Sequence, residues 1–216
     1  MQNQQILKCA FSYFKMKKKK VLVIVAHPDD EIIWMGGTLI RNKDKWDTTI
    51  ISLCRKKDKD RAPKFFRVLK LLNAKGFMSD LEDEKLKPLD KKEIIKRIKK
   101  FSNKEYDYMF THGEKGEYGH IRHIEVHNTV KQMLKEGLIK SKKTFFFCYL
   151  KKSAANTDTG FDCYAQENAD KFINLNKIEL LEKKEIINMI YGFKKNGFEE
   201  RNSRDREAFR LRGQAL

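Results

Sequence analysis

The sequence predicts an α/β fold with three layers, in which a mostly parallel sheet lies between two layers of helices. A continuous apolar run at 21–26, rich in β-branched residues, is typical of a strand buried on both faces of a parallel sheet. Segments with strand character alternate with segments of helical periodicity, which indicates a doubly wound, Rossmann-like order. The 216 residues, of which 40% are hydrophobic, suit one domain with a sizeable core.

The elements follow from these patterns in chain order. Strands are expected at 21–26, 48–53, 76–78, 106–111, 144–150 and 172–175. Helices are expected at 31–41, 62–74, 90–101, 121–136 and 178–191. The segment 153–168 is polar and lacks periodicity, so we expect a loop there, and the tail from Asn196 is charged with few apolar anchors. Ligands of such sheets bind beyond the carboxyl ends of the strands, which directs attention to the residues after 26, 53, 111 and 150.

The beginning of the chain differs from the rest. Met16 is followed by four lysines and then by the first strand, so we expect 1–15 to be an extension or a mis-assigned start, and 16–216 to be the single domain. No apolar run is long enough to span a membrane, and the order of charged and apolar residues does not fit a signal peptide. A cytoplasmic protein is therefore expected. The four cysteines include no Cys-x-x-Cys pair, which argues against a disulfide framework and a thiolate zinc site.

The formal net charge of +17 has two interpretations. It indicates either an anionic partner or a surface on which lysine fills solvated helix faces. The lysines are spread through amphipathic stretches such as 91–100 and 177–184, which favours the second. The sequence has no recognition helix and no aromatic–basic motif, so no specific nucleic acid is expected as a partner. No Gly-x-Gly-x-x-Gly follows the first strand, which disfavours a dinucleotide-dependent oxidoreductase.

The five histidines lie where a ligand would bind. His27 follows the first strand directly and precedes Asp29, Asp30 and Glu31. The strand at 106–111 ends in Thr-His-Gly, which contains His112. Three further histidines are spaced to share one face of the next helix, and these are His120, His123 and His127.

Each of these features alone has a structural explanation. Two aspartates after a strand often cap the following helix, and a histidine face is often simply packed or exposed. Their joint occurrence favours a metal site. Hydrolytic zinc takes three His or carboxylate ligands and keeps a position for water, which His27, Asp30 and one histidine of the 120–127 segment could supply. Asp29 would then be the base, and His120 would stabilise the oxyanion or protonate the leaving amine.

Two motifs carry a resemblance to a known family. Ala26-His-Pro-Asp-Asp-Glu31 after a buried strand, with Gly36-Gly37 shortly behind it, resembles the signature of the LmbE-like, or PIG-L, N-acetylglucosaminyl deacetylases. The segment from Gly116 to His127, Gly-Glu-Tyr-Gly-His-Ile-Arg-His-Ile-Glu-Val-His, resembles their second motif, Gly-His-x-x-His. The resemblance covers 21–127 well and extends more loosely to about 198.

The resemblance implies a role for each matching residue. It implies that His27, Asp30 and His123 hold zinc and that Asp29 is the general base. It further implies that His120 assists the transition state.

Tyr118 is expected to help hold the oxyanion, and Arg61 stands where relatives have a substrate-binding arginine. Glu31, His127 and His112 are expected around the site rather than on the substrate. Trp34 and Trp46 could stack on a sugar, but core packing explains them without such a role and is the favoured interpretation.

One position departs from the family's pattern. Relatives often read Gly-His-Pro-Asp-His, whereas this chain has Gly119-His-Ile-Arg-His123, so that Arg122 replaces an acidic residue. A cation close to His120 would lower the pKa of its imidazole.

The expected activity is zinc-dependent removal of the acetyl group from an N-acetyl amino sugar of the GlcNAc type. The substrate could be acidic or lipid-linked, and Fe²⁺ or another divalent metal could replace zinc. Alternatives are an amidase or deacylase for another N-acyl substrate, and a non-catalytic basic nucleic-acid-binding protein. A homo-oligomer is compatible with the sequence. The substrate-selecting loops are expected at 55–61, 79–88 and 151–168.

Overall fold

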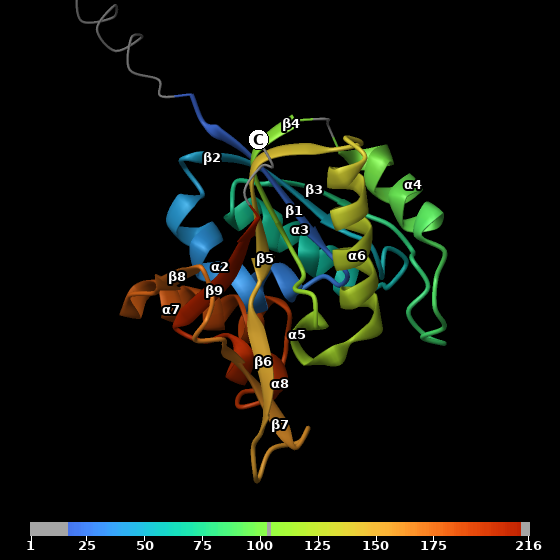
Figure 1. Cartoon of the computed structure of the whole chain (residues 1–216). Coiled ribbons are helices and arrows are strands. Elements are labelled where there is room, and N and C mark those ends of the chain that lie inside the picture. Colours follow the sequence, from blue (N-terminus) through green and yellow to red (C-terminus); the bar gives the residue numbers. More distant parts are fainter. Residues whose placement is uncertain (1–16, 103–104, 213–216) are drawn as a thin grey trace, which may run out of the picture.

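The computed structural model describes residues 17–102 and 105–212, so the expected extension at 1–15 lies outside the described residues. Within them, seven strands form one sheet with the order β3-β2-β1-β4-β5-β9-β8 (Figure 1). The neighbours from β3 to β5 are parallel, and β9 and β8 are antiparallel, so the predicted mostly parallel sheet is confirmed. The strands are β1 (Lys19–Val25), β2 (Trp46–Ser52), β3 (Lys75–Met78), β4 (Glu105–Thr111), β5 (Lys140–Phe147), β8 (Lys171–Asn174) and β9 (Arg206–Arg212).

Two hydrophobic cores lie on the two faces of this sheet. Alternate residues of β1 point to opposite faces, so Val23 belongs to one core and Leu22 to the other. Residues of α2 (Asp30–Asn42), α3 (Arg61–Leu71) and the π-helix η1 (Ile186–Ile190) build the first core. Residues of α4 (Lys91–Phe101) and α6 (Ile121–Lys135) build the second. The remaining helices are α5 (Gly116–Gly119), α7 (Lys177–Glu185) and α8 (Phe198–Asn202).

The expected loop at 153–168 is instead largely a hairpin. Strands β6 (Tyr149–Ser153) and β7 (Phe161–Ala165) pair in a separate two-stranded sheet that projects from the body of the molecule (Figure 1). The ammonium of Lys151 lies 4.0 Å from the ring centroid of Phe161, across the hairpin. β6 is exposed beyond Tyr149 and β7 is buried or half-buried, and neither strand has the regular apolar alternation that predicts a strand.

The charged tail contains a strand that the sequence did not predict. β9 lies between β5 and β8, and Phe147 pairs with Phe209 across the first of these ladders. Glu207, Ala208 and Phe209 are buried. The pairing partners are more than 30 residues away along the chain, so local pattern gives little signal for this strand.

Helix α2 is kinked behind the first motif. Met35 has non-helical angles of φ −148° and ψ 19°. The carboxylate of Glu207 accepts the amides of Gly37 and Thr38, each at 2.8 Å, and the buried ammonium of Lys183 contacts the same carboxylate at 2.8 Å. The end of β9 nearest α7 therefore fixes the helix that carries the first motif.

Gly37 packs closely on the chain before α7, and we expect Gly37→Ala to destabilise the protein. A Cβ there would lie 2.2 Å from the side chain of Leu175, so the expected loss is about 1–3 kcal/mol in the free energy of unfolding. Denaturant unfolding measures it. In a Leu175→Ala background the same change should cost much less, and an equal cost in both backgrounds would contradict the steric explanation.

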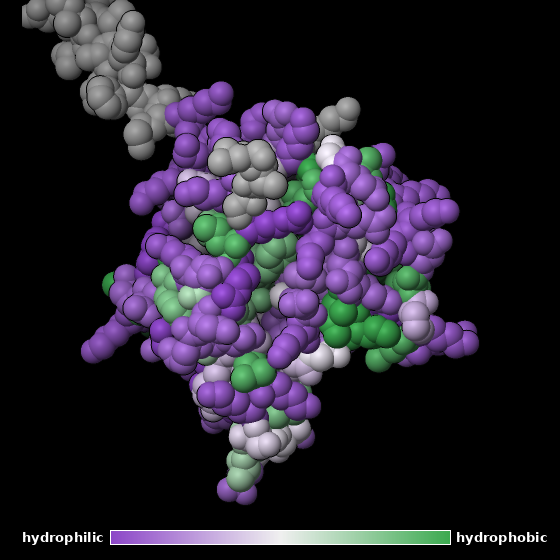
Figure 2. Space-filling view, in the orientation of Figure 1, coloured by the Kyte–Doolittle hydropathy of each residue, from purple (hydrophilic) through white to green (hydrophobic). Residues whose placement is uncertain are grey.

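The face shown in Figure 2 is polar, as both interpretations of the net charge expect. Most of this face is hydrophilic, with scattered apolar patches between the hydrophilic side chains. Among the described residues, no helix has the length and apolar character needed to cross a bilayer.

Candidate functional site

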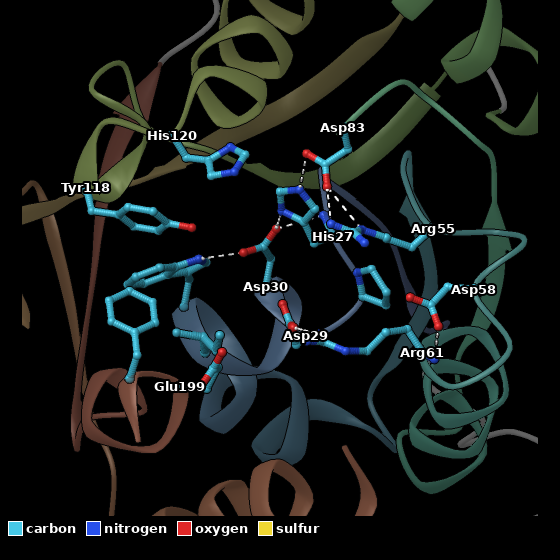
Figure 3. Close-up of a pocket in the computed structure, with 14 residues that line it drawn as sticks. His27, Asp29, Asp30, Arg55, Asp58, Arg61, Asp83, Tyr118, His120 and Glu199 are labelled. Atoms are coloured by element: carbon cyan, nitrogen blue, oxygen red, sulfur yellow. Dashed lines mark hydrogen bonds and ion pairs between the residues drawn. The ribbon is translucent and has the colours of Figure 1, made fainter. Parts of the chain in front are cut away.

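A pocket opens where the chain order of the sheet reverses. The chain runs outward from β1 to β3 and then returns to β4 on the other side of β1, so the segments after β1 and β4 border a crevice. The pocket has a volume of about 240 Å³. Its lining combines an aromatic side with a charged side (Figure 3). The lining residues are His27, Pro28, Asp29, Asp30, Ile33, Trp34, Arg55, Asp58, Arg61, Asp83, Tyr118, His120, Phe198 and Glu199.

Three side-chain atoms form a nearly equilateral triangle beside this pocket. His27 Nδ1 lies 3.2 Å from His123 Nε2 and 3.2 Å from Asp30 Oδ2. His123 Nε2 lies 3.3 Å from Asp30 Oδ2. His27 and Asp30 follow the end of β1, and His123 lies in the first turn of α6.

This triangle fits a divalent metal. Ligand atoms at about 2.0–2.1 Å from a tetrahedral zinc ion are about 3.3 Å from one another, which is the spacing found here. Two imidazoles and one carboxylate are also a donor set that hydrolytic zinc sites use. The Trp34 indole donates to the other oxygen of Asp30, at 3.1 Å, and holds that carboxylate in place.

The outer nitrogen of each imidazole in the triangle contacts a carboxylate. His123 Nδ1 lies 2.6 Å from Glu117 Oε2, and His27 Nε2 lies 2.9 Å from Asp83 Oδ1. A carboxylate only accepts, so these nitrogens carry the protons and leave the inner nitrogens free as ligands. Figure 3 shows Asp83 above His27, on the side away from Asp30.

The charges around the triangle shift its pKa values. Burial alone would lower the pKa of His123, but Asp30 and Glu117 outweigh it and raise the pKa to about 9. Burial alone would raise the pKa of Glu117, yet His112 and His123 lower it to about 2. The same arrangement of carboxylates favours a bound cation.

Three other groups of potential ligands overlap the triangle. The first joins His120 to His27 and His123, and the Nδ1 of His120 already accepts the amide of Arg122. Two groups remain. One includes His112, whose Nε2 accepts the amide of Ala26 at 2.9 Å and is therefore occupied. The other includes Cys54, and burial raises the pKa of its thiol, which disfavours the thiolate that a metal requires. The proton positions therefore favour His27, Asp30 and His123 as the metal ligands.

Asp29 faces the pocket from a strained backbone. Its φ is 122°, a region that few residues other than glycine adopt, and the Glu31 carboxylate accepts its amide at 3.1 Å. Although Asp29 stands at the N-cap of α2, its side chain makes no capping bond and pairs instead with Arg61. Glu31 is held by the hydroxyl of Tyr191 at 2.5 Å. Helix capping therefore does not account for this aspartate.

His120 and Tyr118 border the pocket on the other side. His120 Nδ1 accepts the amide of Arg122 at 3.3 Å as the N-cap of α6, so the neutral ring carries its proton on Nε2. Burial, and then the charges of His123 and His27, lower the pKa of His120 to about 4. The hydroxyl of Tyr118 points into the pocket (Figure 3). The guanidinium of Arg122 points elsewhere, to two glutamates outside the pocket.

The structure thus brings seven of the predicted site residues together, namely His27, Asp29, Asp30, Arg61, Tyr118, His120 and His123. His112 and His127 do not line the pocket, and His127 Nδ1 donates to the carbonyl of His112 at 2.9 Å. The indole of Trp34 is fully buried, and Trp46 packs against Tyr108 and Phe110 of β4.

Sequence reasoning missed two carboxylates, Glu117 and Asp83. Glu117 lies inside the second motif, where its position six residues before His123 was a usable signal. Asp83 lies in the 79–88 loop, which was expected at the crevice, but its acidic neighbours Glu82 and Glu84 gave no means of choosing it.

Comparison with solved structures confirms the fold. The N,N'-diacetylchitobiose deacetylase from Pyrococcus horikoshii has a TM-score of 0.60 at 17% identity, with 95% of this chain and 92% of that chain covered. A deacetylase of teicoplanin biosynthesis has a TM-score of 0.56 at 11% identity, covering 80% and 84%. GalB, the 4-carboxy-2-hydroxymuconate hydratase of Pseudomonas putida, has 0.59 at 13%, covering 86% and 83%. Since one of these is a hydratase, the fold alone does not name the reaction.

Sequence comparison is more specific. An uncharacterised protein, L374 of Acanthamoeba polyphaga mimivirus, is 27% identical over 145 residues, which are 60% of this chain and 63% of that protein. The match therefore spans less than two thirds of that relative. The family model described as GlcNAc-PI de-N-acetylase matches residues 22–134, more than half of the chain and a range that includes both motifs. The chain therefore belongs to the PIG-L family.

Proposed function

We propose that this chain hydrolyses the N-acetyl group of a GlcNAc-type amino sugar or sugar conjugate, with a divalent metal at His27, Asp30 and His123. The triangle of ligand atoms beside Asp29 is the observation that supports it most. Membership in the PIG-L family supports the deacetylase class. Zinc is the proposed ion, and Fe²⁺ is compatible with the same donors.

The residues divide the reaction among them. The bound metal supplies Lewis-acid activation of water and of the amide carbonyl. Asp29 takes the proton from the attacking water and returns it to the amine as the C–N bond breaks, which leaves acetate and the free amino sugar. Burial and the nearby Asp30 raise the pKa of Asp29, which suits a group that must hold this proton, and the guanidinium of Arg61 opposes the shift.

His120 and Tyr118 are the proposed partners of the oxyanion. The Nε2 proton of His120 gives a neutral donor beside the metal ligands. Its pKa of about 4 keeps the imidazole neutral at pH 7, so a hydrogen bond to the oxyanion fits better than proton transfer to the amine. The hydroxyl of Tyr118 is a second donor, and burial raises its pKa, so it stays protonated.

The pocket favours a small polar group over a long acyl chain. Its volume of about 240 Å³ is below the range of drug-sized sites, about 300–1,000 Å³. Its charged side offers Arg55, Asp58, Arg61 and Asp83, which can bond hydroxyl groups. The surplus of basic residues would attract an anionic aglycone outside the pocket.

Removal of the metal should abolish the activity. Dialysis against a chelator is expected to stop acetate release from N-acetylglucosamine conjugates, and added Zn²⁺ should restore it. Metal content by mass spectrometry and acetate release would be measured on the same samples. Full activity in metal-free protein would contradict the proposal.

A substrate panel separates the alternatives. It would include free N-acetylglucosamine, its phosphorylated and lipid-linked conjugates, an N-butyryl glucosamine and a simple N-acetyl amino acid. Acetate release confined to the sugars supports the proposal. Hydrolysis of the amino acid amide or the longer acyl group instead would favour a general amidase or deacylase.

A further inference from the structure

Two carboxylates from different parts of the chain orient His123 and His27, the histidines of the triangle. Glu117 lies in the short helix α5 directly before α6 and contacts both His112 and His123, so its position follows from the second motif itself. Asp83 reaches His27 from the long segment between β3 and α4, and this part of the segment has no regular secondary structure. Something must therefore hold the segment against the site.

Arg55 contacts the second oxygen of the Asp83 carboxylate at 2.8 and 3.1 Å, and the side chain of Arg122 holds the neighbouring residue, Glu82. The Arg122 guanidinium is fully buried and donates to the carbonyl of Glu82, the residue next to Asp83. It also contacts the Glu82 carboxylate at 2.5 Å and the Glu125 carboxylate at 2.6 Å. The second oxygen of Glu125 accepts the amide of Leu89 at 2.8 Å. The first turns of α6 thus hold the segment at both ends of 82–89.

Burial of a guanidinium is costly unless every donor is satisfied. Here the Nε, Nη1 and Nη2 groups of Arg122 all have acceptors. An apolar side chain could fill the same space, but it could not bind the carbonyl and carboxylate of Glu82. The charged group therefore serves the attachment of the segment more than the packing of α6.

We propose that Arg122 is a positioning residue for the metal site, and that it acts through Asp83. By holding Glu82 on α6, it places the Asp83 carboxylate on His27 Nε2, which keeps the proton there and the Nδ1 lone pair toward the metal position. The proposal rests on the proposed function, because it assumes that His27 is a ligand. It also gives a role to the residue at which this chain departs from the Gly-His-Pro-Asp-His pattern.

A double-mutant cycle on zinc affinity tests the connection. The four proteins are wild type, Arg122→Met, Asp83→Asn and the double variant, each stripped of metal and titrated with Zn²⁺ against a chelating indicator. Loss of an outer partner of a metal ligand typically costs about 10–100-fold in affinity, and that loss is expected for each single variant. The double variant should bind zinc no more weakly than Asp83→Asn alone.

Two further variants guard the result. If Arg122→Met does not fold, Glu82→Ala replaces it in the cycle, because the Glu82 side chain is partly exposed and its loss spares the packing of α6. Arg97→Met removes an arginine from the Glu93 pair on α4 and should leave zinc affinity unchanged. Circular dichroism on each protein confirms folding before titration.

The outcomes separate this inference from the proposed function. If wild type binds zinc and releases acetate, but Arg122→Met or Glu82→Ala binds zinc as tightly as wild type, the inference alone is wrong. Additive losses in the double variant would equally overturn it, since Arg122 would then act independently of Asp83. If wild type binds no zinc, both the proposed function and the inference fail.

Discussion

Replacement of His123 by alanine should remove both the metal and the activity, whereas Asp29→Asn should remove the activity alone. His123 Nε2 is one corner of the triangle, so its loss leaves two ligands and an open side. The Asp29 carboxylate pairs with Arg61 and is not one of the three corners of the triangle. Loss of a general base typically lowers the rate by about 10²–10⁴-fold.

The choice of variants keeps the comparison clean. Asparagine is nearly isosteric with aspartate and is among the residues that best tolerate a positive φ, so the strained backbone at position 29 should persist. His127→Gln is the matched control, because His127 lies one turn further along α6 and donates to the His112 carbonyl outside the pocket. The His127→Gln variant should retain its metal.

Metal content and acetate release on each purified variant decide the matter. Equal zinc in wild type and His123→Ala would refute the ligand assignment. A wild-type rate in Asp29→Asn would refute the assignment of Asp29 as the general base.

Glu207→Leu should cause the largest loss of stability that we predict. The side chains of Glu207 and Lys183 are 0% and 1% exposed and contact each other at 2.8 Å. Loss of one partner from a buried ion pair typically costs about 3–5 kcal/mol, because the other charge stays buried without compensation. Here the amides of Gly37 and Thr38 also lose their acceptor at the kink of α2.

Denaturant unfolding of metal-free protein measures this loss without interference from ligand binding. Glu167→Gln is the control. It breaks an exposed ion pair with Arg206, the neighbour of Glu207 on β9, and should cost less than about 1 kcal/mol. Equal losses in the two variants would show that the buried pair has no special part in stability. Lys183→Met should destabilise less than Glu207→Leu, because it leaves the acceptor of the α2 amides in place.

The sequence predicted the centre of the sheet and most of the site, because these depend on local signals. The β-branched run of β1 and the apolar periodicity of α4 and α6 act over a few residues, and each of these three elements lies within a few residues of its expected place. The first motif directly follows a strand end, so topology alone put His27, Asp29 and Asp30 at the crevice. The family resemblance then chose His123 among three histidines on one face, and the family itself is confirmed.

What the sequence could not show depends on contacts between distant segments. β9 is a strand because β5 and β8 offer it backbone partners, and its own residues are mostly charged. Nothing in the sequence near Lys183 distinguishes it from the surface lysines, because its partner Glu207 lies 24 residues further along the chain.

At the site, the sequence by itself determined which side chains follow β1 and β4. Only the tertiary structure decided their proton positions, because Glu117, Asp83 and the amide of Ala26 each select one nitrogen of an imidazole. A hydrogen-bond partner fixes a tautomer at a distance of about 3 Å, and such proximity between residues far apart in the chain exists only after folding.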